Sequence, residues 1–529
     1  MDRSRWVAAI AALALLGIAS TIYATSLGIG LIADSKYYLE AAQGLLLGRG
    51  FTVPTPLGEP APLTNWPPLF SAILAGLGLL GLDLRTGARW LNAGLLGGTV
   101  VLGSLAILHV TRKSLPAVVF GGLLLATSVD LLTVHAQAGS EPLFIFFVLL
   151  GLILVAAHLE HPTLPRLLGA SAAAALAFLS RYPGVVLVVA GAIGLLLFDR
   201  RAWQRRVRDT GIFTGLSALP MIVWMGRNWL SARQPIGSFR VLEAHPVTPV
   251  QLRLGLSTVW GWISPSPAPG SGPTSLVGHV PGLRWVVLAG GLAGGAVATR
   301  RWRDWRARNQ ETEPLLAPPL LRLLATFILL YLAFVVVSIS LFDATIPLDV
   351  RLLSPVFATV VVFAVGSGFR LAAAFRGSAV ARGAMALGCL ILAGAYGSAA
   401  ARWIRRAHAN GLGYADKGWQ QSDVLRDVRA LPPGVLIYTN GDDVVTLVTD
   451  RLTLELPRKV RLNTGQPNPS YEAELAAMAD RLRAGAVLVY LHRVTWRTAV
   501  YGSEAELRDR LHLRIRTAAA DGAIYDIAP

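Results

Sequence analysis

Long apolar stretches follow one another along the first 400 residues and are separated by short polar loops. A helix rises about 1.5 Å per residue and the hydrocarbon core of a bilayer is about 30 Å thick, so about 17 to 25 apolar residues in a row predict a transmembrane helix. The stretch 68–82 fits a further span, a re-entrant segment or an interfacial segment. About 11 spans are predicted, at 6–27, 87–110, 116–134, 141–158, 166–180, 184–198, 210–230, 283–299, 321–342, 353–373 and 383–400.

The pattern changes beyond residue 400, where acidic and basic residues become frequent and nearly balanced. Short apolar runs such as VLIYT (435–439) and AVLVYLH (486–492) predict buried strands. Amphipathic runs such as SYEAELAAMADRLRAG (470–485) and GSEAELRDRL (502–511) predict helices. We therefore expect an α-helical polytopic membrane domain over residues 1–400, followed by a small soluble α/β domain over 401–529.

Composition supports the membrane assignment. Of the 529 residues, 53% are hydrophobic and only 15% are charged, with a mean hydropathy of +0.53. Soluble domains carry about 25% charged residues, so this composition excludes an ordinary soluble protein. The single cysteine, Cys389, excludes an intramolecular disulfide and a cysteine-based metal site.

The formal net charge of +17 could indicate a nucleic-acid partner, but its position along the chain indicates a membrane topology instead. Basic residues recur after every second predicted span, as at Arg112 and Lys113 and in the blocks 199–209 and 299–308. By the positive-inside rule these loops and the N-terminus are cytoplasmic. We therefore expect a multi-pass cell-membrane protein whose C-terminal domain is extracytoplasmic, with no nucleic-acid partner. The first span lacks a good cleavage site and is interpreted as an anchor.

Acidic residues gather in the loops that this topology places outside. Acids near the middle of spans would indicate an ion-coupled transporter. The predicted spans contain almost no acids, and Asp130 is the main exception. Asp34 follows the first span directly and precedes an amphipathic helical pattern. The external acids are Asp34, Glu40, Glu59, Glu141, Glu243, Asp343 and Asp349.

Several stretches resemble those of the GT-C superfamily of integral-membrane glycosyltransferases. The resemblance is to the bacterial aminoarabinose-transferase-like and protein O-mannosyltransferase-like enzymes of the glycosyltransferase family 39 type. It implies transfer of a sugar, with inversion, from a polyprenyl-phosphate carrier to a glycan, glycolipid or protein acceptor on the external face. The stretches are ADSKYYLEAAQGLLLGRGF (33–51), NWPPLF (65–70), GSEPLF (139–144), SRYPG (180–184), GRNWL (226–230), LDVRLLSP (348–355) and YTNGDDVVTLVTDR (438–451).

The family's catalytic acid lies in the first external loop, which corresponds to Asp34. Many members have a second acid immediately after it or two residues beyond, where this chain has Ser35 and Lys36. Hard divalent cations prefer several oxygen ligands, so we expect no metal and no other cofactor. Asp34 together with Glu141 could still form a weak cation site.

The chemistry of a lipid-phosphate donor points to further residues. The donor carries a good leaving group, so the enzyme needs a base for the acceptor hydroxyl and fixed positive charge for the departing phosphate. Asp34 is the first candidate for the base, and Glu141 is the second. Arg351 is the first candidate for the phosphate, because arginine binds phosphate oxygens in a bidentate manner and a loop re-enters the membrane there. Further phosphate candidates are Arg181, Arg227 and Lys36.

Each of these residues also has a purely structural interpretation. Asp34 could cap the helix that follows it, and Glu141 precedes Pro142 at the start of a span, where acids are common. The arginines at span ends could anchor lipid headgroups. For the whole chain, the alternatives are a lipid or sugar transporter and an enzyme resembling an O-antigen ligase or polymerase.

Overall fold

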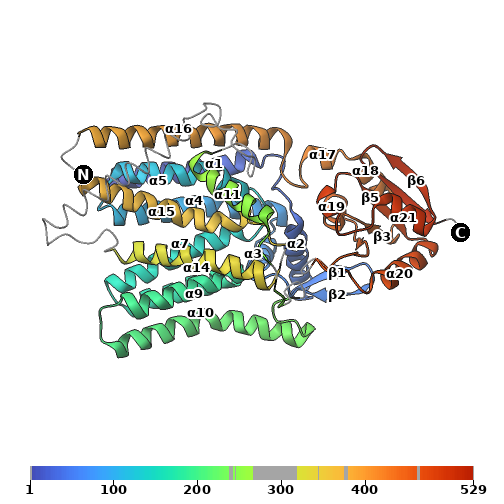
Figure 1. Ribbon diagram of the computed structural model, residues 1–529, viewed down its shortest axis with the longest axis horizontal. Coiled ribbons are helices and arrows are strands. Elements are labelled where there is room, and N and C mark those ends of the chain that lie inside the picture. Colours follow the sequence, from blue (N-terminus) through green and yellow to red (C-terminus); the bar gives the residue numbers. More distant parts are fainter. Residues whose placement is uncertain are drawn as a thin grey trace.

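The computed structural model describes residues 3–237, 242–244, 246–265, 318–343, 345–374, 379–461 and 465–527. A bundle of long helices forms one end of the molecule and a small sheet flanked by helices forms the other (Figure 1). Between them lie helix α2 (Ala33–Leu46), helix α3 (Leu69–Leu79) and the antiparallel hairpin of β1 (Thr52–Thr55) and β2 (Gly58–Pro62).

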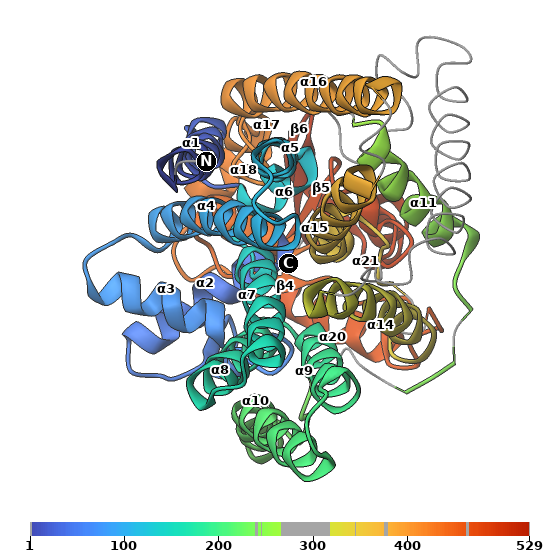
Figure 2. The ribbon, with the colours of Figure 1, turned by 90° about the vertical axis from the view of Figure 1, so that its left-hand side faces the viewer.

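The long helices run side by side, with α7 between α4, α8, α14 and α15 when the bundle is viewed end-on (Figure 2). A π-helical turn (Gly194–Phe198) continues α9, and α11 (Pro249–Ile263) packs on α15. The helices of the bundle are α1 (Arg3–Ala24), α4 (Leu84–Val110), α5 (Leu115–Thr127), α6 (Val129–His135), α7 (Glu141–Glu160), α8 (Leu164–Ser180), α9 (Val185–Ile193), α10 (Trp203–Ala232), α14 (Pro319–Leu341), α15 (Val350–Ala374) and α16 (Ala379–Asn410).

Several of these helices are long and apolar enough to cross a membrane, as the sequence predicted, but the count of about 11 spans is not confirmed. Within the described residues, 6 helices meet this condition, or 7 if the bent pair α5 and α6 forms one span with a 51° break. The predicted span 166–180 corresponds to α8, and the predicted span 184–198 corresponds to α9 with its π-helical turn; both are shorter apolar helices. The stretch 68–82 contains the 11-residue helix α3. The predicted span 283–299 lies outside the described residues.

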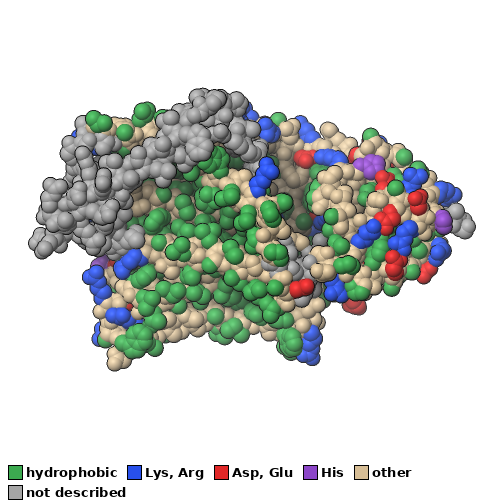
Figure 3. Space-filling model, viewed as in Figure 1, with side chains coloured by type: hydrophobic (Ala, Val, Ile, Leu, Met, Phe, Trp, Pro, Cys, Tyr) green, Lys and Arg blue, Asp and Glu red, His purple; other side chains and the backbone are tan. Residues whose placement is uncertain are grey.

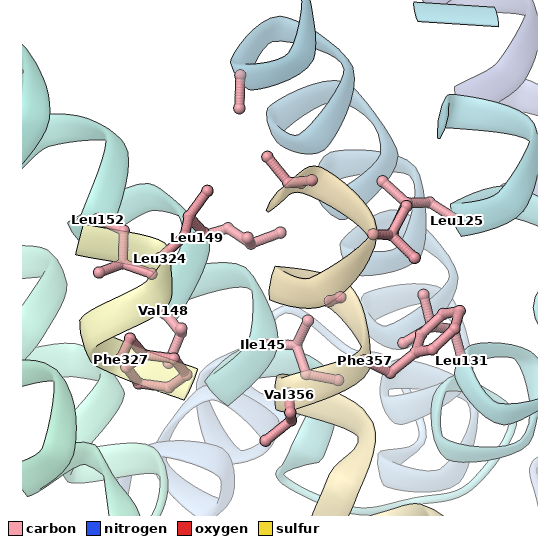
Figure 4. Close-up of a cluster of buried hydrophobic side chains, with 14 of the residues drawn as sticks. Leu125, Leu131, Ile145, Val148, Leu149, Leu152, Leu324, Phe327, Val356 and Phe357 are labelled. Atoms are coloured by element: carbon pink, nitrogen blue, oxygen red, sulfur yellow. The ribbon is translucent and has the colours of Figure 1, made fainter. Parts of the chain in front are cut away.

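The core of the bundle is built from aliphatic and aromatic side chains of helices α1, α4 to α10 and α14 to α16. Ile145 and Val148 of α7 lie between Phe327 of α14 and Phe357 of α15, and Leu125 of α5 packs nearby (Figure 4). All of these side chains are buried. Inside a bilayer these side chains hold the helices together by van der Waals packing, and the helix ends that carry polar side chains are thereby held in fixed positions.

The C-terminal part is a five-stranded mixed sheet in the order β4-β3-β5-β7-β6. Strand β3 is parallel to β4 and β5, while β7 is antiparallel to β5 and β6. Its strands are β3 (Ile437–Thr439), β4 (Leu454–Glu455), β5 (Val487–Leu491), β6 (Leu513–Ala519) and β7 (Gly522–Ile527). Its helices are α17 (Lys417–Gln420), α18 (Asp423–Ala430), α19 (Asp442–Thr449), α20 (Tyr471–Arg483) and α21 (Glu504–Leu511).

The sheet and the bundle are joined by a common apolar core. Leu31 and Leu39, at the start of the chain, belong to the same buried cluster as Val444 and Val448 of α19. The backbone of Leu31 also accepts a 2.8 Å hydrogen bond from the amide of Tyr414. We call this contact region, from α2 to α19 and residues 411–414, the junction.

Helix α16 leads into the junction. It continues to Asn410, so the predicted boundary at residue 400 falls inside a helix. Gly413 then passes so close to Leu31 that an added Cβ would lie 2.1 Å from the Leu31 carbonyl oxygen, and its φ of +55° also favours glycine. The backbone at Gly413 therefore packs directly against the backbone of Leu31, two residues before α2 begins.

Candidate active site

A cavity of about 320 Å³ lies where the start of α2, the end of α8 and the start of α15 meet. These elements are far apart in the sequence, and the cavity exists only because the bundle brings their ends together. The side chains that carry its chemistry are Asp34, Trp66, Arg181, Tyr182 and Arg351. Two of the four arginine and lysine candidates and the first carboxylate candidate therefore share one site.

Arg351 is at the centre of this site. It is the second residue of α15. Its Nη2 donates to Asp34 Oδ2 at 2.5 Å and to Glu141 Oε1 at 2.6 Å, and its Nε donates to Glu141 Oε1 at 2.9 Å. Charge-assisted contacts of this kind are about twice as strong as neutral hydrogen bonds. One guanidinium thus fixes two carboxylates that are far apart in the chain.

Glu141 lies beneath the arginines and does not line the cavity. It begins α7, where the positive end of the helix dipole favours a carboxylate. Its side chain is 3% exposed, and Arg181 Nη1 reaches its Oε1 at 2.6 Å. Arg181 and Arg351 therefore converge on one buried carboxylate oxygen, which holds the two positive charges side by side at the cavity.

Asp34 does not act as a side-chain cap of α2. The N-cap residue is Ile32, and its amide donates to the hydroxyl of Ser35 at 3.0 Å. Both Asp34 oxygens instead accept from side chains, since Trp66 Nε1 donates to Oδ1 at 3.2 Å and Arg351 holds Oδ2. The Asp34 side chain is 27% exposed, so it remains open to a molecule in the cavity.

Aromatic residues complete the wall. Trp66 stacks on Tyr37, with ring centroids 3.9 Å apart and planes 18° apart. The hydroxyl of Tyr182 donates to the Thr64 carbonyl oxygen at 3.1 Å. Neither Trp66 nor Tyr182 was assigned a role in the site from the sequence. The stretches NWPPLF and SRYPG, which carry Trp66 and Tyr182, were the available signal.

Two further acids line the cavity, Asp343 and Asp349. Both were recognised as external acids, but neither was assigned a role. Asp343 accepts from the amide and hydroxyl of Thr345, at 2.9 and 2.6 Å. Asp349 accepts from the amide of Leu352 at 3.1 Å, and burial raises the pKa of its carboxyl. Both acids are held by their own loop and shape the side of the cavity that faces Asp34.

Arg227 and Lys36, the remaining phosphate candidates, lie outside the cavity lining. The guanidinium of Arg227 donates to the carbonyl oxygens of Leu63 and Phe51 at 2.7 Å each, so it fastens the two ends of the β1–β2 hairpin to α10. Lys36 points to the junction, where its Nζ lies 3.0 Å from Asp442 Oδ2. Arg227 is thus directed at backbone carbonyl oxygens and Lys36 at a carboxylate of the junction, and neither lines this cavity.

The contact between Lys36 and Asp442 is part of a buried network. Arg497 donates to Asp442 at 2.9 Å and to Asp443 at 3.1 Å, and Tyr414 donates to Asp443 at 2.7 Å. Burial alone would lower the pKa of Lys36, but the charges of Asp442, Glu40 and Asp443 together with the hydrogen bond to Asp442 outweigh burial, and the pKa is raised. Lys36 is therefore a fixed cation that ties α2 to α19.

The arrangement of carboxylates bears on metal binding. Within the described part of the chain, no three His, Cys, Asp or Glu side chains are grouped in a way that could hold a metal ion. Asp34 and Glu141, which the sequence suggested as a weak pair of ligands, both contact Arg351. A cation between them would have to displace that guanidinium. The expectation that no metal takes part stays a prediction.

Comparisons with known proteins agree with the sequence motifs. Residues 65–224, which include Trp66, Glu141 and Arg181, match the family model described as dolichyl-phosphate-mannose-protein mannosyltransferase. No curated protein matches the sequence significantly.

Among solved structures, apo ArnT from Cupriavidus metallidurans is similar over 100% of both chains, with a TM-score of 0.57 and 14% sequence identity. The same protein bound to undecaprenyl phosphate gives a TM-score of 0.55 over 100% of both chains, also at 14% identity. The arabinofuranosyltransferase AftD from Mycobacteria is similar over 100% of this chain and 40% of its own, with a TM-score of 0.50 and 14% identity. The predicted resemblance to GT-C glycosyltransferases is thus confirmed, and the chain has their fold.

Proposed function

We propose that this chain is an inverting glycosyltransferase that takes a sugar from a polyprenyl-phosphate carrier and transfers it to an acceptor on the extracytoplasmic face of the membrane. The observation that carries the proposal is the contact of Arg351 with Asp34 at 2.5 Å in an open cavity at the ends of the bundle helices. The matching family model and the shared fold both indicate a glycosyltransferase. Undecaprenyl phosphate bound to ArnT supports a lipid-phosphate donor.

In this proposal the acceptor hydroxyl attacks the anomeric carbon from the side opposite the phosphate. The new bond joins the acceptor oxygen to that carbon, and the bond between the carbon and the phosphate oxygen breaks, with its electron pair leaving on the phosphate. Asp34 accepts the hydroxyl proton, a step typically worth a factor of about 10² to 10⁴ in rate. A single displacement inverts the anomeric configuration.

Arg351 and Arg181 bind the phosphate in this proposal. Both are fixed by Glu141, which acts as a positioning residue because its carboxylate is buried beneath them. A phosphate that enters the cavity competes with Asp34 for Arg351. When the phosphate takes over that guanidinium, Asp34 Oδ2 is left free to accept a hydrogen bond from the acceptor hydroxyl. Donor binding therefore also prepares the base.

The ring of Trp66, which lines the cavity, and the cavity volume suit one sugar ring, since sugars stack their C–H faces on aromatic rings. The acceptor is a glycan, a glycolipid or a protein. No metal or other cofactor takes part in the proposed step, because Arg351 and Arg181 supply the positive charge that the phosphate requires.

A transfer assay in proteoliposomes separates this enzyme from the alternatives. Proteoliposomes that contain the protein, a polyprenyl-phosphate donor with a radiolabelled sugar and crude envelope acceptor should yield labelled acceptor. A transporter would move the labelled lipid or sugar across the bilayer without forming labelled acceptor. An enzyme resembling an O-antigen ligase or polymerase would transfer an oligosaccharide from a diphosphate carrier and would not use the monophosphate donor.

The proposed sidedness follows from the basic loops of the sequence. A cysteine in place of Ala520, between β6 and β7, should react with an impermeant thiol reagent in intact cells that carry Cys389→Ser. A cysteine in place of His161, between α7 and α8, should react only after lysis. The reverse pattern would place the C-terminal sheet in the cytoplasm and contradict the proposed acceptor side.

Arg351→Ala should abolish detectable binding of the lipid-phosphate donor, because the charge-assisted contacts of this guanidinium with the phosphate are lost. Arg370→Ala is the matched control, since Arg370 lies near the other end of the same helix and donates to the Val110 carbonyl oxygen. Binding of radiolabelled donor to detergent-purified protein measures both. Equal donor affinity in the two variants would remove Arg351 from the phosphate site.

A further inference from the structure

A second cavity, of about 360 Å³, opens where α16 ends and the C-terminal part begins. Trp403 and Ala407 of α16 and the following Leu412 form an apolar wall. Basic side chains gather on the surface at this boundary between the bundle and the sheet (Figure 3). Three basic residues line the cavity, namely Arg406, Lys417 and Arg493. The cavity therefore has one apolar and one cationic side.

The positive charge of this cavity is largely uncompensated. Arg406 and Lys417 form no ion pair with any residue in the described part of the chain. Asp416 is the one acid in the lining, and its Oδ1 accepts from the Trp419 amide at 2.9 Å at the start of α17. Arg493 reaches that oxygen only at 4.0 Å. A net charge of about two positive units remains for a ligand.

Arg493 is held in place although it lacks a close carboxylate. Its guanidinium lies 4.1 Å from the centre of the Trp419 ring, a favourable cation–π distance. It also lies close to Gly418, where an added Cβ would lie 2.8 Å from Arg493 Nη1. The guanidinium thus packs against an aromatic ring and against a backbone position that has no side chain. Such packing pre-organises the donors of an anion site.

The position of the cavity indicates which anion it takes. Arg382–Asn410 of α16 is long and apolar enough to span a membrane, so its end at Trp403 and Arg406 lies at the level of lipid headgroups. Arginine and lysine bind phosphate oxygens, and an apolar wall that continues into the bilayer suits acyl chains. We infer that this cavity binds the phosphate headgroup of an anionic lipid, with the acyl chains along α16. The inference does not depend on the proposed glycosyl transfer.

The bound lipid would also act on the junction. Residues 411–414 connect the cavity lining to Leu31, because Gly413 pairs with Leu31 in a β-bridge. Leu31 leads directly into α2, which carries Asp34. A lipid that fastens this segment stabilises the start of α2 by its own binding free energy.

The test compares phosphatidylglycerol, phosphatidylcholine and inorganic phosphate as probes on the full chain purified in detergent. Native mass spectrometry counts the lipid retained, and the shift of Tm on lipid addition measures the stabilisation. We expect retention of phosphatidylglycerol in preference to phosphatidylcholine. The double variant Lys417→Gln and Arg493→Gln should bind phosphatidylglycerol at least about tenfold more weakly, since two charge-assisted contacts are lost.

Two controls make the result specific. Arg516→Gln removes an exposed charge on β6, away from the cavity, and should leave lipid binding unchanged. Lys417→Arg keeps the charge and should keep the affinity. Equal binding of phosphatidylglycerol to the parent and the double variant would overturn the inference. Binding of inorganic phosphate without retention of lipid would assign the site to a free anion and overturn the lipid assignment.

Discussion

Asp34→Asn should lower the rate of sugar transfer by a factor of about 10² to 10⁴ while leaving the fold close to that of the parent and donor binding no weaker than in the parent. Asparagine has the same size as aspartate and can still accept from Trp66, but it cannot take a proton from the acceptor hydroxyl. It also leaves the start of α2 intact, because the amide of Ile32 is satisfied by Ser35 rather than by Asp34. Turnover, donor affinity and Tm are measured on the same preparation.

Asp83→Asn is the matched control. Asp83 precedes α4 and accepts from the amide of Thr86 at 2.9 Å, a contact that asparagine can also make. Turnover of this variant should equal that of the parent. Near-normal turnover of Asp34→Asn would mean that the base lies elsewhere. Loss of donor affinity equal to the loss of turnover would mean that Asp34 serves binding rather than proton transfer.

Asp442→Leu should lower the free energy of local opening of α2 by about 3 kcal/mol or more. Amide hydrogens of α2 should therefore exchange about 10² times faster. The side chains of Lys36 and Asp442 are only 11% and 9% exposed, so removal of the carboxylate leaves an unpaired buried ammonium. Lys36→Met should destabilise α2 less than Asp442→Leu does, since Asp442 keeps its contact with Arg497 at 2.9 Å. Hydrogen exchange measured by mass spectrometry on α2 peptides reports both variants.

The double variant Lys36→Met and Asp442→Leu should recover part of the stability that Asp442→Leu loses, because two apolar side chains can replace a buried ion pair. Arg483→Met breaks the exposed contact of Arg483 with Asp480, whose side chains are 61% and 76% exposed, and should change exchange little. Exchange that is unchanged in Asp442→Leu would show that the apolar contacts alone hold α2 against α19.

Much of the fold could be predicted because its elements carry strong local patterns. The apolar runs that became α4, α7, α14 and α15 have the length of a membrane span, and the strand β5 was visible as AVLVYLH. Breaks inside apolar runs were not visible in the same way. The 51° bend between α5 and α6 falls at Ser128, inside the predicted span 116–134, and the stretch 210–230 became part of the longer α10.

The site was predictable only in part, and the reason is geometric. Asp34 and Arg351 were both singled out, but their contact joins positions 317 residues apart, which no local pattern reveals. Lys36 was grouped with the phosphate candidates, whereas the structure directs its ammonium to Asp442. Residues i and i+2 of a helix face different sides, whereas i and i+4 share one. Tyr38 accordingly lines the cavity beside Asp34, while Lys36 faces α19.

The common apolar core of the junction has a consequence for how the protein is made. Lys36 and Asp442 meet across 406 positions of sequence, so α2 emerges early in synthesis and receives its partner only near the end. Until then Leu31 and Leu39 have no cover from the C-terminal sheet. During this interval α2 depends on the bilayer surface or on a chaperone to avoid non-native contacts. A chain that terminates prematurely, before α19, would keep that apolar surface exposed and would be a substrate for membrane quality-control proteases rather than a slow enzyme.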